Sequence, residues 1–213
     1  MANTCISKIA VKGSKDELQA FVSLLNEMEN HSKSFGERWI GNVLIASGLS
    51  MEEIQTESIY CRGTIHPKDF SNLDDEYRQF QIDDDGVFRF DMMTKNIMSY
   101  SFLQFIKTKF PSFIFAWHTI DEFLNFSLFH DPEHLLDVPY YCVNGFIFGK
   151  DEYPAFLEHL RGVCDGLTVP VDKNYLKSSK FRQTFEQWIE MNEYDESVCF
   201  FFISEEDPMA ANF

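Results

Sequence analysis

The residues of this sequence that could do chemistry are its histidines, cysteines and acidic clusters. His130 and His134 stand four positions apart with Asp131 and Glu133 between them, a spacing that on a helix would place two metal ligands on one face. In the same segment, Asp131 can cap a helical turn and Pro132 suits its first position, which would leave His130 outside the turn. The sequence favours the second interpretation, a capped connector without a metal.

A second acidic cluster consists of Asp83, Asp84 and Asp85, followed by a glycine and flanked by YRQFQI and VFRFDMM. A calcium loop needs alternating acidic ligands and a distal glutamate, whereas these three aspartates are contiguous. The Asp-Gly step is typical of the tight turn of a β-hairpin. We therefore predict a hairpin and no calcium site.

The five cysteines are scattered, odd in number and never spaced as CxxC. They indicate neither a disulfide framework nor a thiolate zinc site, so buried free thiols are expected. The six histidines have no partner motif for nucleophilic catalysis, although a triad can be assembled from distant positions. No catalytic residue, metal or cofactor is predicted, and a binding function is favoured over an enzyme.

The chain is strongly acidic, with 34 acidic and 18 basic residues and a formal charge of -16. This charge would repel phosphate backbones and anionic lipid, so no direct nucleic-acid or membrane binding is expected. Solubility is the simplest explanation of the charge, and docking on a basic partner protein or mimicry of nucleic acid stay open. The N-terminus MANTCISKIAVKG has no signal-peptide segment and no apolar run reaches membrane-span length, so a cytoplasmic protein is expected. The oligomeric state is not predicted.

The elements that must position these residues follow from hydrophobic periodicity. In the first half, a helix is predicted after Ser14, which forms a capping box with Glu17. Another short helix is predicted after Ser50, which forms a capping box with Glu53. A further helix begins after Ser99 and ends near Pro111. The predicted strands are CISKIAV, SIYCRGTI, the two arms around DDDG, FIFAWHTI and FLNFSLF.

The segment HDPEHLLDVP separates this half from the second. The second half is predicted to contain a strand at YYCVNGFIFG, a helix with Pro154 in its first turn, a short edge strand at GLTVPV, a helix bearing Phe181 and Phe185, and a strand at SVCFFFI before an acidic tail. KDEYPAFLEHL at 150–160 resembles KDELQAFVSLL at 15–25. Either a duplication or the shared preferences of amphipathic helices would explain the likeness.

The order of elements predicts an α+β fold. Residues 1–130 fit a ferredoxin-like antiparallel sheet with helices on one face, and residues 139–213 fit a second, smaller α+β lobe that is either a partial repeat or unrelated.

Several blocks of the first half also resemble a known family. They are Asn3, Cys5 and Gly13, then Trp39, Gly41 and Asn42 in RWIGN, then Tyr60, Cys61, Arg62 and Gly63 in IYCRG, followed by VFRFDMMT and KFPSFIF. With these blocks, residues 1–130 resemble the YubB-like ferredoxin-like family of plasmid and phage proteins, which includes uncharacterised relatives from mobile elements of gut bacteria. The resemblance implies a mobile-element protein and no established reaction, cofactor or ligand. Relatives carry a Thr-Ala-Trp-Ser-like segment after the FRF strand, where this chain has TKNI around Asn96.

Three residues are candidates for binding: Trp39, Arg62 and Asn96. An arginine inside an apolar strand must face solvent or pair with a carboxylate, and a salt bridge is the favoured interpretation. Trp39 beside Gly41 is either a ligand platform or a core anchor. The expected function is non-catalytic interaction with another protein through an acidic surface, and the alternatives are a small-ligand-binding protein or an enzyme with an unrecognised active site.

Overall fold

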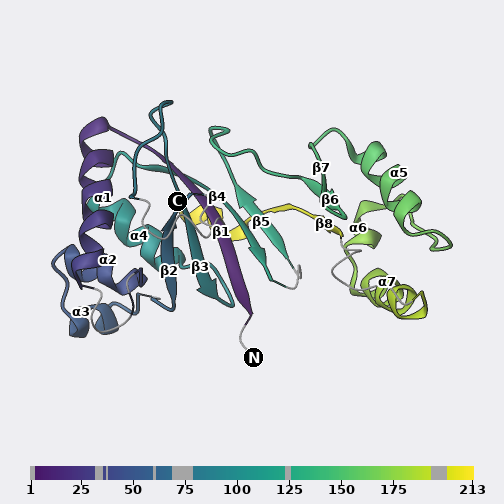
Figure 1. Cartoon of the computed structure of the whole chain (residues 1–213), viewed down its shortest axis with the longest axis horizontal. Helices are drawn as coiled ribbons and strands as arrows, with labels where there is room; N and C mark the ends of the chain where they lie inside the picture. The colour runs from purple at the N-terminus through teal and green to yellow at the C-terminus, as the bar shows by residue number, and fades with distance from the viewer. Residues whose placement is uncertain are drawn as a thin grey trace. The chain divides into compact units, whose positions relative to one another are not determined.

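The computed structural model describes residues 3–31, 36, 38–59, 61–68, 79–122, 126–192 and 201–213, and the chain divides into two compact units (Figure 1). Unit 1 comprises Met1–Asp137 and Glu206–Phe213, and unit 2 comprises Val138–Glu205. The last residues, which the sequence assigned to the lobe 139–213, therefore belong to unit 1. Unit 2 is an insertion before the C-terminal segment of unit 1.

Unit 1 is built on a sheet whose longer strands are antiparallel to their neighbours. Its elements are β1 (Thr4–Lys12), α1 (Lys15–Glu27), η1 (Met28–His31), α2 (Ile40–Ala46), α3 (Met51–Thr56), β2 (Gly63–Pro67), β3 (Phe88–Lys95), α4 (Tyr100–Lys109), β4 (Ile114–Asp121), β5 (Ser127–His130), β9 (Glu205–Glu206) and η3 (Pro208–Asn212). Among the described residues the strands form a six-stranded sheet in the order β2-β3-β1-β4-β5-β9. β1 is antiparallel to β3 and β4, and β2 is antiparallel to β3. The β2-β3-β1-β4 part has the strand order of a ferredoxin-like fold, and the predicted α+β class is confirmed.

The core of unit 1 lies between one face of the sheet and its helices. Alternation along β1 buries Ile9 and Val11 on this face, where they join Phe88 and Phe90 of β3 and Phe21 of α1. The ring of Phe21 meets those of Phe88 and Phe90 edge-on, at centroid distances of 5.7 and 6.0 Å. Figure 1 shows α1, α2 and α4 gathered on one side of the sheet. The phenylalanine-rich composition therefore serves the core. The opposite face of β1, β3 and β4 carries polar side chains beside a small apolar cluster of Ala10, Val87 and Ala116.

The two predicted capping boxes differ in the structure. Ser14 caps α1 by accepting from the Glu17 amide at 3.4 Å, but the Glu17 carboxylate turns away and accepts from the Ser112 hydroxyl at 2.6 Å. Ser50 and Glu53 form the complete box at the start of α3, and hydrogen bonds from Ser50 lower the pKa of Glu53. In α1, a long-range contact has replaced half of the local motif.

Two predictions in unit 1 are corrected. The strand predicted at SIYCRGTI begins only at Gly63, because Ser58 adopts a left-handed conformation (φ 54°) after α3, and Tyr60 lies outside the described residues. Arg62 therefore precedes β2 and does not lie inside a strand. At DDDG, the turn is closed by a single bridge between Ile82 and Phe88, and the described residues just before it, 79–81, form no strand.

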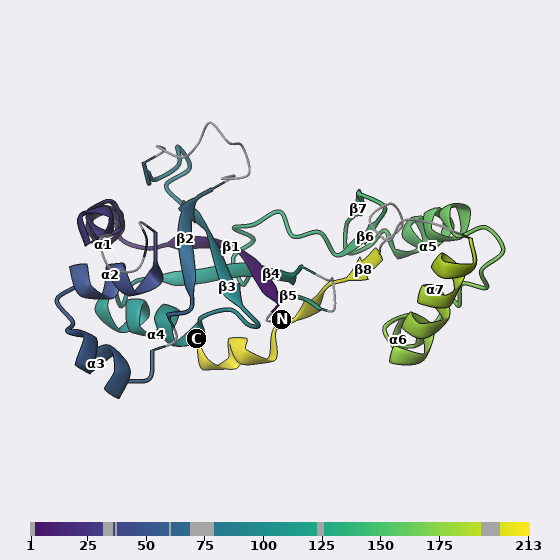
Figure 2. The same cartoon turned by 60° about the horizontal axis from the view of Figure 1, so that its bottom comes forward.

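The predicted acidic tail is instead a fixed part of unit 1. β9 joins the edge of the sheet, and the backbone amide of Asp207 donates to Phe129 O at 2.7 Å. Asp207 is only 2% exposed, and one carboxylate oxygen accepts from Tyr100 Oη at 2.6 Å and from Trp117 Nε1 at 2.8 Å. The ring of Phe213 packs against Trp117 at 4.9 Å. Figure 2 shows this yellow segment returning to unit 1 and ending there.

In its described residues, unit 2 packs three helices against a small sheet. Its elements are β6 (Tyr141–Val143), β7 (Phe146–Phe148), α5 (Tyr153–Val163), α6 (Lys173–Leu176), α7 (Ser179–Met191) and β8 (Phe201–Ile203). The described strands form a three-stranded sheet in the order β7-β6-β8. Its core contains Tyr141, Phe156, Phe181 and Trp188, which confirms the helical faces predicted from periodicity.

The sequence-based assignment of unit 2 is wrong at two strands. YYCVNGFIFG is a hairpin of β6 and β7 and not one strand, because Asn144 and Gly145 both have positive φ angles (50° and 83°) and form the tight turn that Asn-Gly favours. GLTVPV forms no strand, since Gly166 turns the chain at φ 79° and Val169 O accepts from the Arg161 side chain. The part of SVCFFFI before Phe201 lies outside the described residues.

The repeated KDE segments take different structures. Lys15–Glu17 form the first turn of α1, whereas α5 begins only at Tyr153, after the second KDE. Glu152, the counterpart of Glu17, accepts from the Gly149 amide at 2.6 Å. The strand before the first copy is central in its sheet, and the strand before the second is an edge. The two copies therefore share the helix that follows KDE but differ in the structure of KDE itself.

Candidate functional site

The open face of the unit 1 sheet carries a row of polar side chains across four strands. Lys8 on β1 is paired with Asp91 on β3 and with His118 on β4, and Asp91 is paired with His66 on β2. Residues directly opposite one another on antiparallel strands share a face, with Cβ atoms about 5 Å apart. Asp91 is 6% exposed and His118 5% exposed, whereas Lys8 is exposed. The row therefore combines a cation, a buried carboxylate and a buried imidazole.

A hollow of about 420 Å³ lies over this row and belongs entirely to unit 1. Its lining residues are Lys8, Ile9, Lys68, Asp83, Asp85, Arg89, Phe90, Asp91, His118, Leu136 and Asp137. This volume falls at the small end of the range of ligand pockets, and the lining is unusually rich in charge.

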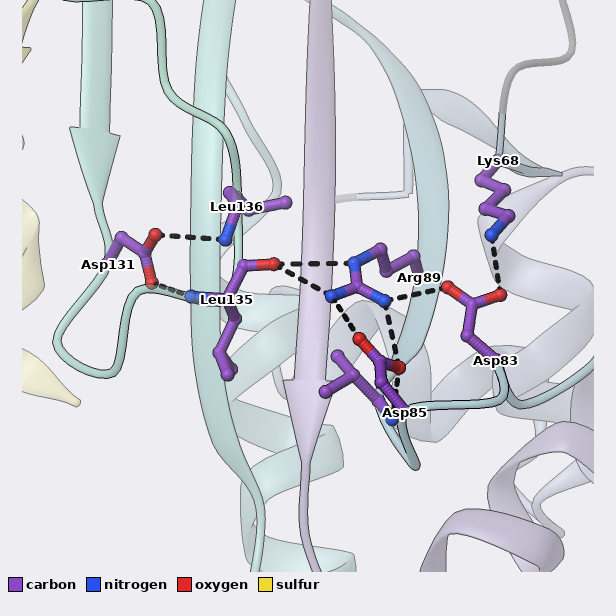
Figure 3. A network of polar contacts seen from close by, with 8 residues as sticks. Lys68, Asp83, Asp85, Arg89, Asp131, Leu135 and Leu136 are labelled. Atoms are coloured by element: carbon purple, nitrogen blue, oxygen red, sulfur yellow. Dashed lines mark hydrogen bonds and ion pairs between the residues drawn. The ribbon is translucent and has the colours of Figure 1, made fainter. Parts of the chain in front are cut away.

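One wall of the hollow is a network of ion pairs centred on Arg89 (Figure 3). Its guanidinium contacts Asp83 and Asp85 at 2.8 Å each and donates to Leu135 O at 3.1 and 3.3 Å. Lys68 contacts the same Asp83 at 2.6 Å. Hydrogen bonds from Arg89 lower the pKa of the Asp85 carboxyl, and those carboxylates raise the pKa of Arg89. These four charged side chains pair with one another. Because Arg89 also donates to Leu135 O, the network links the DDDG turn to the loop that carries Leu135.

That loop is held by Asp131. Its two carboxylate oxygens accept from the amides of Leu135 at 2.7 Å and Leu136 at 3.0 Å (Figure 3). His134 has a left-handed backbone (φ 54°), and the ring of His130 lies 4.6 Å from that of Trp117, outside the turn. Across the described residues, no group of three or more His, Cys, Asp or Glu side chains could hold a metal ion. HDPEH thus forms a turn capped by Asp131.

A buried serine and histidine lie next to each other at the edge of this site. His118 Nε2 is 2.9 Å from Ser127 Oγ. Burial and the nearby charge of Lys8 lower the pKa of His118 to about 4, so its imidazole is neutral and weakly basic at neutral pH. Ser127 is 3% exposed and does not line the hollow. The pair therefore stabilises the sheet and is poorly suited to activate a nucleophile.

The described cysteines are all free thiols, and their environment suppresses reactivity. Burial raises the pKa of Cys61 to about 11. Burial, with the charges of Asp121 and Glu122, also raises the pKa of Cys5 to about 11. Because the thiolate is the nucleophile and the metal ligand, neither residue is reactive at neutral pH.

Of the three predicted binding residues, Trp39 and Arg62 lie beside β2, whereas Asn96 follows β3 on the side of β1. Trp39 is the half-buried N-cap residue of α2 and bridges to Thr64, and its ring lies so close to Gly41 that a Cβ there would be 2.0 Å away. Arg62 is exposed, and its carbonyl accepts from the Lys95 amide at 3.2 Å. Asn96 is exposed, has φ 70° and donates from its amide to Asn3 O. None of the three lines the hollow.

Among the residues that line the hollow, the sequence analysis discussed Asp83 and Asp85, as part of the DDDG turn, but not the residues of the strands. Lys8, Arg89, Asp91 and His118 alternate along their strands with buried apolar residues such as Ile9, Phe90 and Trp117. Alternation alone could have flagged them as one face of a sheet. Which of these residues become neighbours depends on the register of three strands that are far apart in the chain.

The acidic composition of the chain is also seen in the exposed side chains of unit 1. Several of its basic side chains are used within unit 1, where they contact carboxylates or carbonyl oxygens: Lys12 with Glu133, Lys68 with Asp83, Arg89 with Asp83 and Asp85, Lys107 with Phe113 O, and Lys109 with Ser47 O. Exposed carboxylates without an ion pair in the described part of the chain include Asp16, Glu27, Glu52, Glu57 and Glu122. The exposed, uncompensated charge is therefore mainly negative.

Unit 2 presents apolar side chains at the edge of its sheet. Phe146 is 59% exposed and Ile147 67% exposed on β7, which is an edge strand. The ring of Phe146 lies 4.5 Å from that of His159 on α5. Exposed apolar clusters are common at protein contact surfaces.

Comparison of the chain with protein-family models, curated proteins and solved structures found no match. In the described residues, no helix has the length and apolar character that crossing a membrane requires.

Proposed function

We propose that this protein is a non-catalytic interaction protein whose acidic unit 1 surface binds a basic segment of another protein. The observation that carries the proposal is the internal use of its basic side chains, which leaves exposed carboxylates unbalanced. Complementary charge mainly raises the rate of association and is screened by salt over about 10 Å at 0.1 M. A basic partner would bind tightly at low salt and weakly at high salt.

The state of the titratable groups supports binding over catalysis. The described histidine and thiol groups with large pKa shifts, His66, His118, Cys5 and Cys61, all move away from the values that proton transfer or nucleophilic attack near pH 7 would need. His66 shows the same trend as His118, since burial and then the charge of Arg38 lower its pKa to about 4. These shifts fit a scaffold more closely than an active site.

The short helix α3 offers a direct test of the acidic surface. Glu52 and Glu57 are exposed there, while Glu53 is needed for the capping box. The double variant E52Q/E57Q should bind the partner several-fold more weakly than the wild type at low salt. The matched control is E186Q/E190Q on α7, which removes the same charge from exposed positions of unit 2.

The partner would be captured from cells of the source organism at low and high salt, identified, purified and titrated by calorimetry. Weaker binding of the α3 variant, with the control unchanged, would support the proposal. Equal loss in both variants, or binding that ignores salt, would contradict it. So would turnover in a broad hydrolase screen that disappears in H118Q, because the protein would then be an enzyme.

We also propose, from the sequence blocks named above, that unit 1 belongs to the YubB-like family and that the protein is associated with mobile elements. The ferredoxin-like strand order of unit 1 agrees with that assignment without being specific to it. Genes of plasmid or phage origin beside the gene for this chain would support it, and a conserved chromosomal neighbourhood would count against it.

A further inference from the structure

Strand β7 is an edge of the unit 2 sheet that lacks most of the features by which edge strands avoid pairing with other chains. It consists of Phe146, Ile147 and Phe148, without a charged residue, a proline or a bulge. Natural edge strands are usually protected by charge, by proline, by a bulge or by a covering segment. Here Phe146 is 59% exposed and Ile147 67% exposed. The edge therefore presents apolar side chains to solvent.

The register of the β6-β7 hairpin shows which backbone groups face outward. Val143 and Phe146 flank the tight turn and form the first pair of the ladder. In such a hairpin the first pair exchanges both hydrogen bonds, and in the next pair the amides and carbonyls point away from the partner strand. That next pair is Cys142 and Ile147. The N–H and C=O of Ile147 therefore point to the open edge, and no backbone group of the described residues pairs with them there.

Helix α5 adds an unsatisfied polar atom at this edge. The ring of His159 lies 4.5 Å from that of Phe146 and 5.7 Å from that of Phe148. Its Nε2 atom is buried and has no hydrogen-bond partner in the part of the chain that the structure describes. A buried polar atom without a partner costs free energy that a hydrogen bond to a ligand would recover. The strand and the helix thus both leave hydrogen-bonding capacity unused at the same edge.

The charge beside this edge is negative. Residues 146–160 contain three acidic residues and a single lysine. Asp151 lies in the turn after β7, Glu152 accepts at 2.6 Å from the first amide beyond the strand, and Glu158 precedes His159 on α5. All three carboxylates are exposed, and none makes an ion pair with the described residues. The single lysine, Lys150, lies over a tyrosine ring at 5.8 Å.

Two kinds of occupant would continue the sheet: a second copy of this chain, or an extended segment of another protein. Each copy carries a formal charge of -16, so two copies repel each other. A basic segment is instead attracted by the carboxylates beside β7. Strand addition is a recurring mode of peptide recognition, in which backbone hydrogen bonds supply affinity and side chains supply specificity. The charge of the edge therefore favours a basic segment of a partner.

We propose that the β7 edge of unit 2 binds an extended, basic segment of a partner protein by strand addition. The outward N–H and C=O of Ile147 pair with the backbone of the added strand, whose apolar side chains pack against Phe146 and Ile147. Its basic side chains lie near Glu158 and the carboxylates that follow β7. This site does not depend on the acidic surface of unit 1.

The probe is a short, fluorescently labelled peptide in which valine and lysine alternate, titrated with the full chain at low salt. Fluorescence anisotropy should show saturable binding. The same peptide with a fully N-methylated backbone has no amide donors and should bind at least about tenfold more weakly. The peptide with glutamate in place of lysine should lose affinity by a similar factor, because the carboxylates beside β7 repel it.

Substitutions at the edge locate the site. I147P removes the outward N–H but no hydrogen bond to β6, so the hairpin should persist while binding weakens about tenfold or more. The matched control I147V keeps this N–H and should bind within about twofold of the wild type. E158Q should bind about two- to threefold more weakly at low salt, and E186Q, at an exposed position of α7, should bind like the wild type.

Circular dichroism shows whether I147P is folded, and if it is not, the N-methylated peptide and E158Q decide the question. The proposal is overturned if the N-methylated peptide binds as tightly as its parent, or if folded I147P or E158Q keeps the affinity of the wild type. Loss of binding in E52Q/E57Q but not in I147P would place the peptide on unit 1 and would also overturn it. So would a dimer of the wild type in ultracentrifugation that I147P abolishes, because β7 would then pair with a second copy.

Discussion

At the scale of single residues, burial decides which groups are available for chemistry. His118 lies in a strand with a polar partner at 2.9 Å and a cation beside it, and its pKa falls to about 4. Asp207 also lies in the core, where Tyr100 and Trp117 satisfy one of its carboxylate oxygens. Both residues have structural roles in the fold. Lys8, which the sequence does not single out, remains exposed over the hollow.

The depressed pKa of His118 predicts a pH dependence of stability. The unfolded chain binds a proton at this histidine below about pH 6.5, whereas the folded chain does so only near pH 4. The free energy of unfolding should therefore fall as the pH drops from 6.5 to 4, by about 3 kcal/mol from this residue. In H118Q, whose amide can still contact Ser127, urea denaturation should show a smaller fall over the same range.

The control for this prediction is H134Q, which replaces an exposed histidine in the loop. It should keep the pH dependence of the wild type. An unchanged slope in H118Q would mean that His118 is protonated in the folded chain at mildly acidic pH, and the assignment of a neutral imidazole would be wrong.

At the scale of elements, the same local signal leads to different structures when its surroundings differ. Ser14 and Glu17 have the spacing of a capping box, yet Glu17 binds Ser112 instead. The KDE segment forms the first turn of α1 and precedes α5. At Gly63, the first residue of β2, the backbone of β3 lies very close. Tertiary contacts therefore set the ends of these elements.

Two glycines allow this closeness to be tested. A Cβ on Gly63 would lie 2.2 Å from Met93 O, a backbone atom that cannot move alone, whereas a Cβ on Gly162 in α5 meets nothing within 4 Å. G63A should destabilise the protein by about 1–3 kcal/mol through overpacking. G162A should stabilise it by about 0.5–1 kcal/mol, since alanine is the better helix former. Urea denaturation measures both, and a neutral G63A would show that β2 is free to shift.

At the scale of the whole molecule, unit 2 lies between two segments of unit 1 in the order of the chain. The chain leaves unit 1 after Asp137 and returns to it at Glu206. The returning segment is fastened by Asp207 and by the ring of Phe213. If the chain is cut just before unit 2, the C-terminal fragment should therefore remain bound to the rest of unit 1 through this returning segment.

Limited proteolysis provides the test. The exposed residues Pro132–His134 are the expected site of cleavage. The two fragments should separate on a denaturing gel but elute together in gel filtration, because the C-terminal segment remains bound to unit 1. In D207N the loss of a buried carboxylate that accepts from Tyr100, Trp117 and the Met209 amide should weaken that hold by about 2–3 kcal/mol, and the nicked fragments should separate more readily. Separation of the nicked wild type would contradict this role of Asp207.

The sequence by itself determined the fold class and most helices of the protein. The periodicity of Leu18, Phe21 and Leu25 predicted α1, and alternation in CISKIAV predicted β1, because burial of one face follows from the backbone repeat. Composition predicted an acidic chain and gave no catalytic signature. These features depend on neighbours within a few residues.

Only the tertiary structure decided the site. Lys8, Asp91 and His118 come from three separate strands, and their juxtaposition depends on strand register, which a single sequence does not specify over 110 residues of separation. Arg62 and Trp39 looked more distinctive in the sequence, but they lie away from the hollow. The acidic tail became a buried anchor because Trp117 and Tyr100, far away in the chain, supply the donors that make burial of Asp207 favourable.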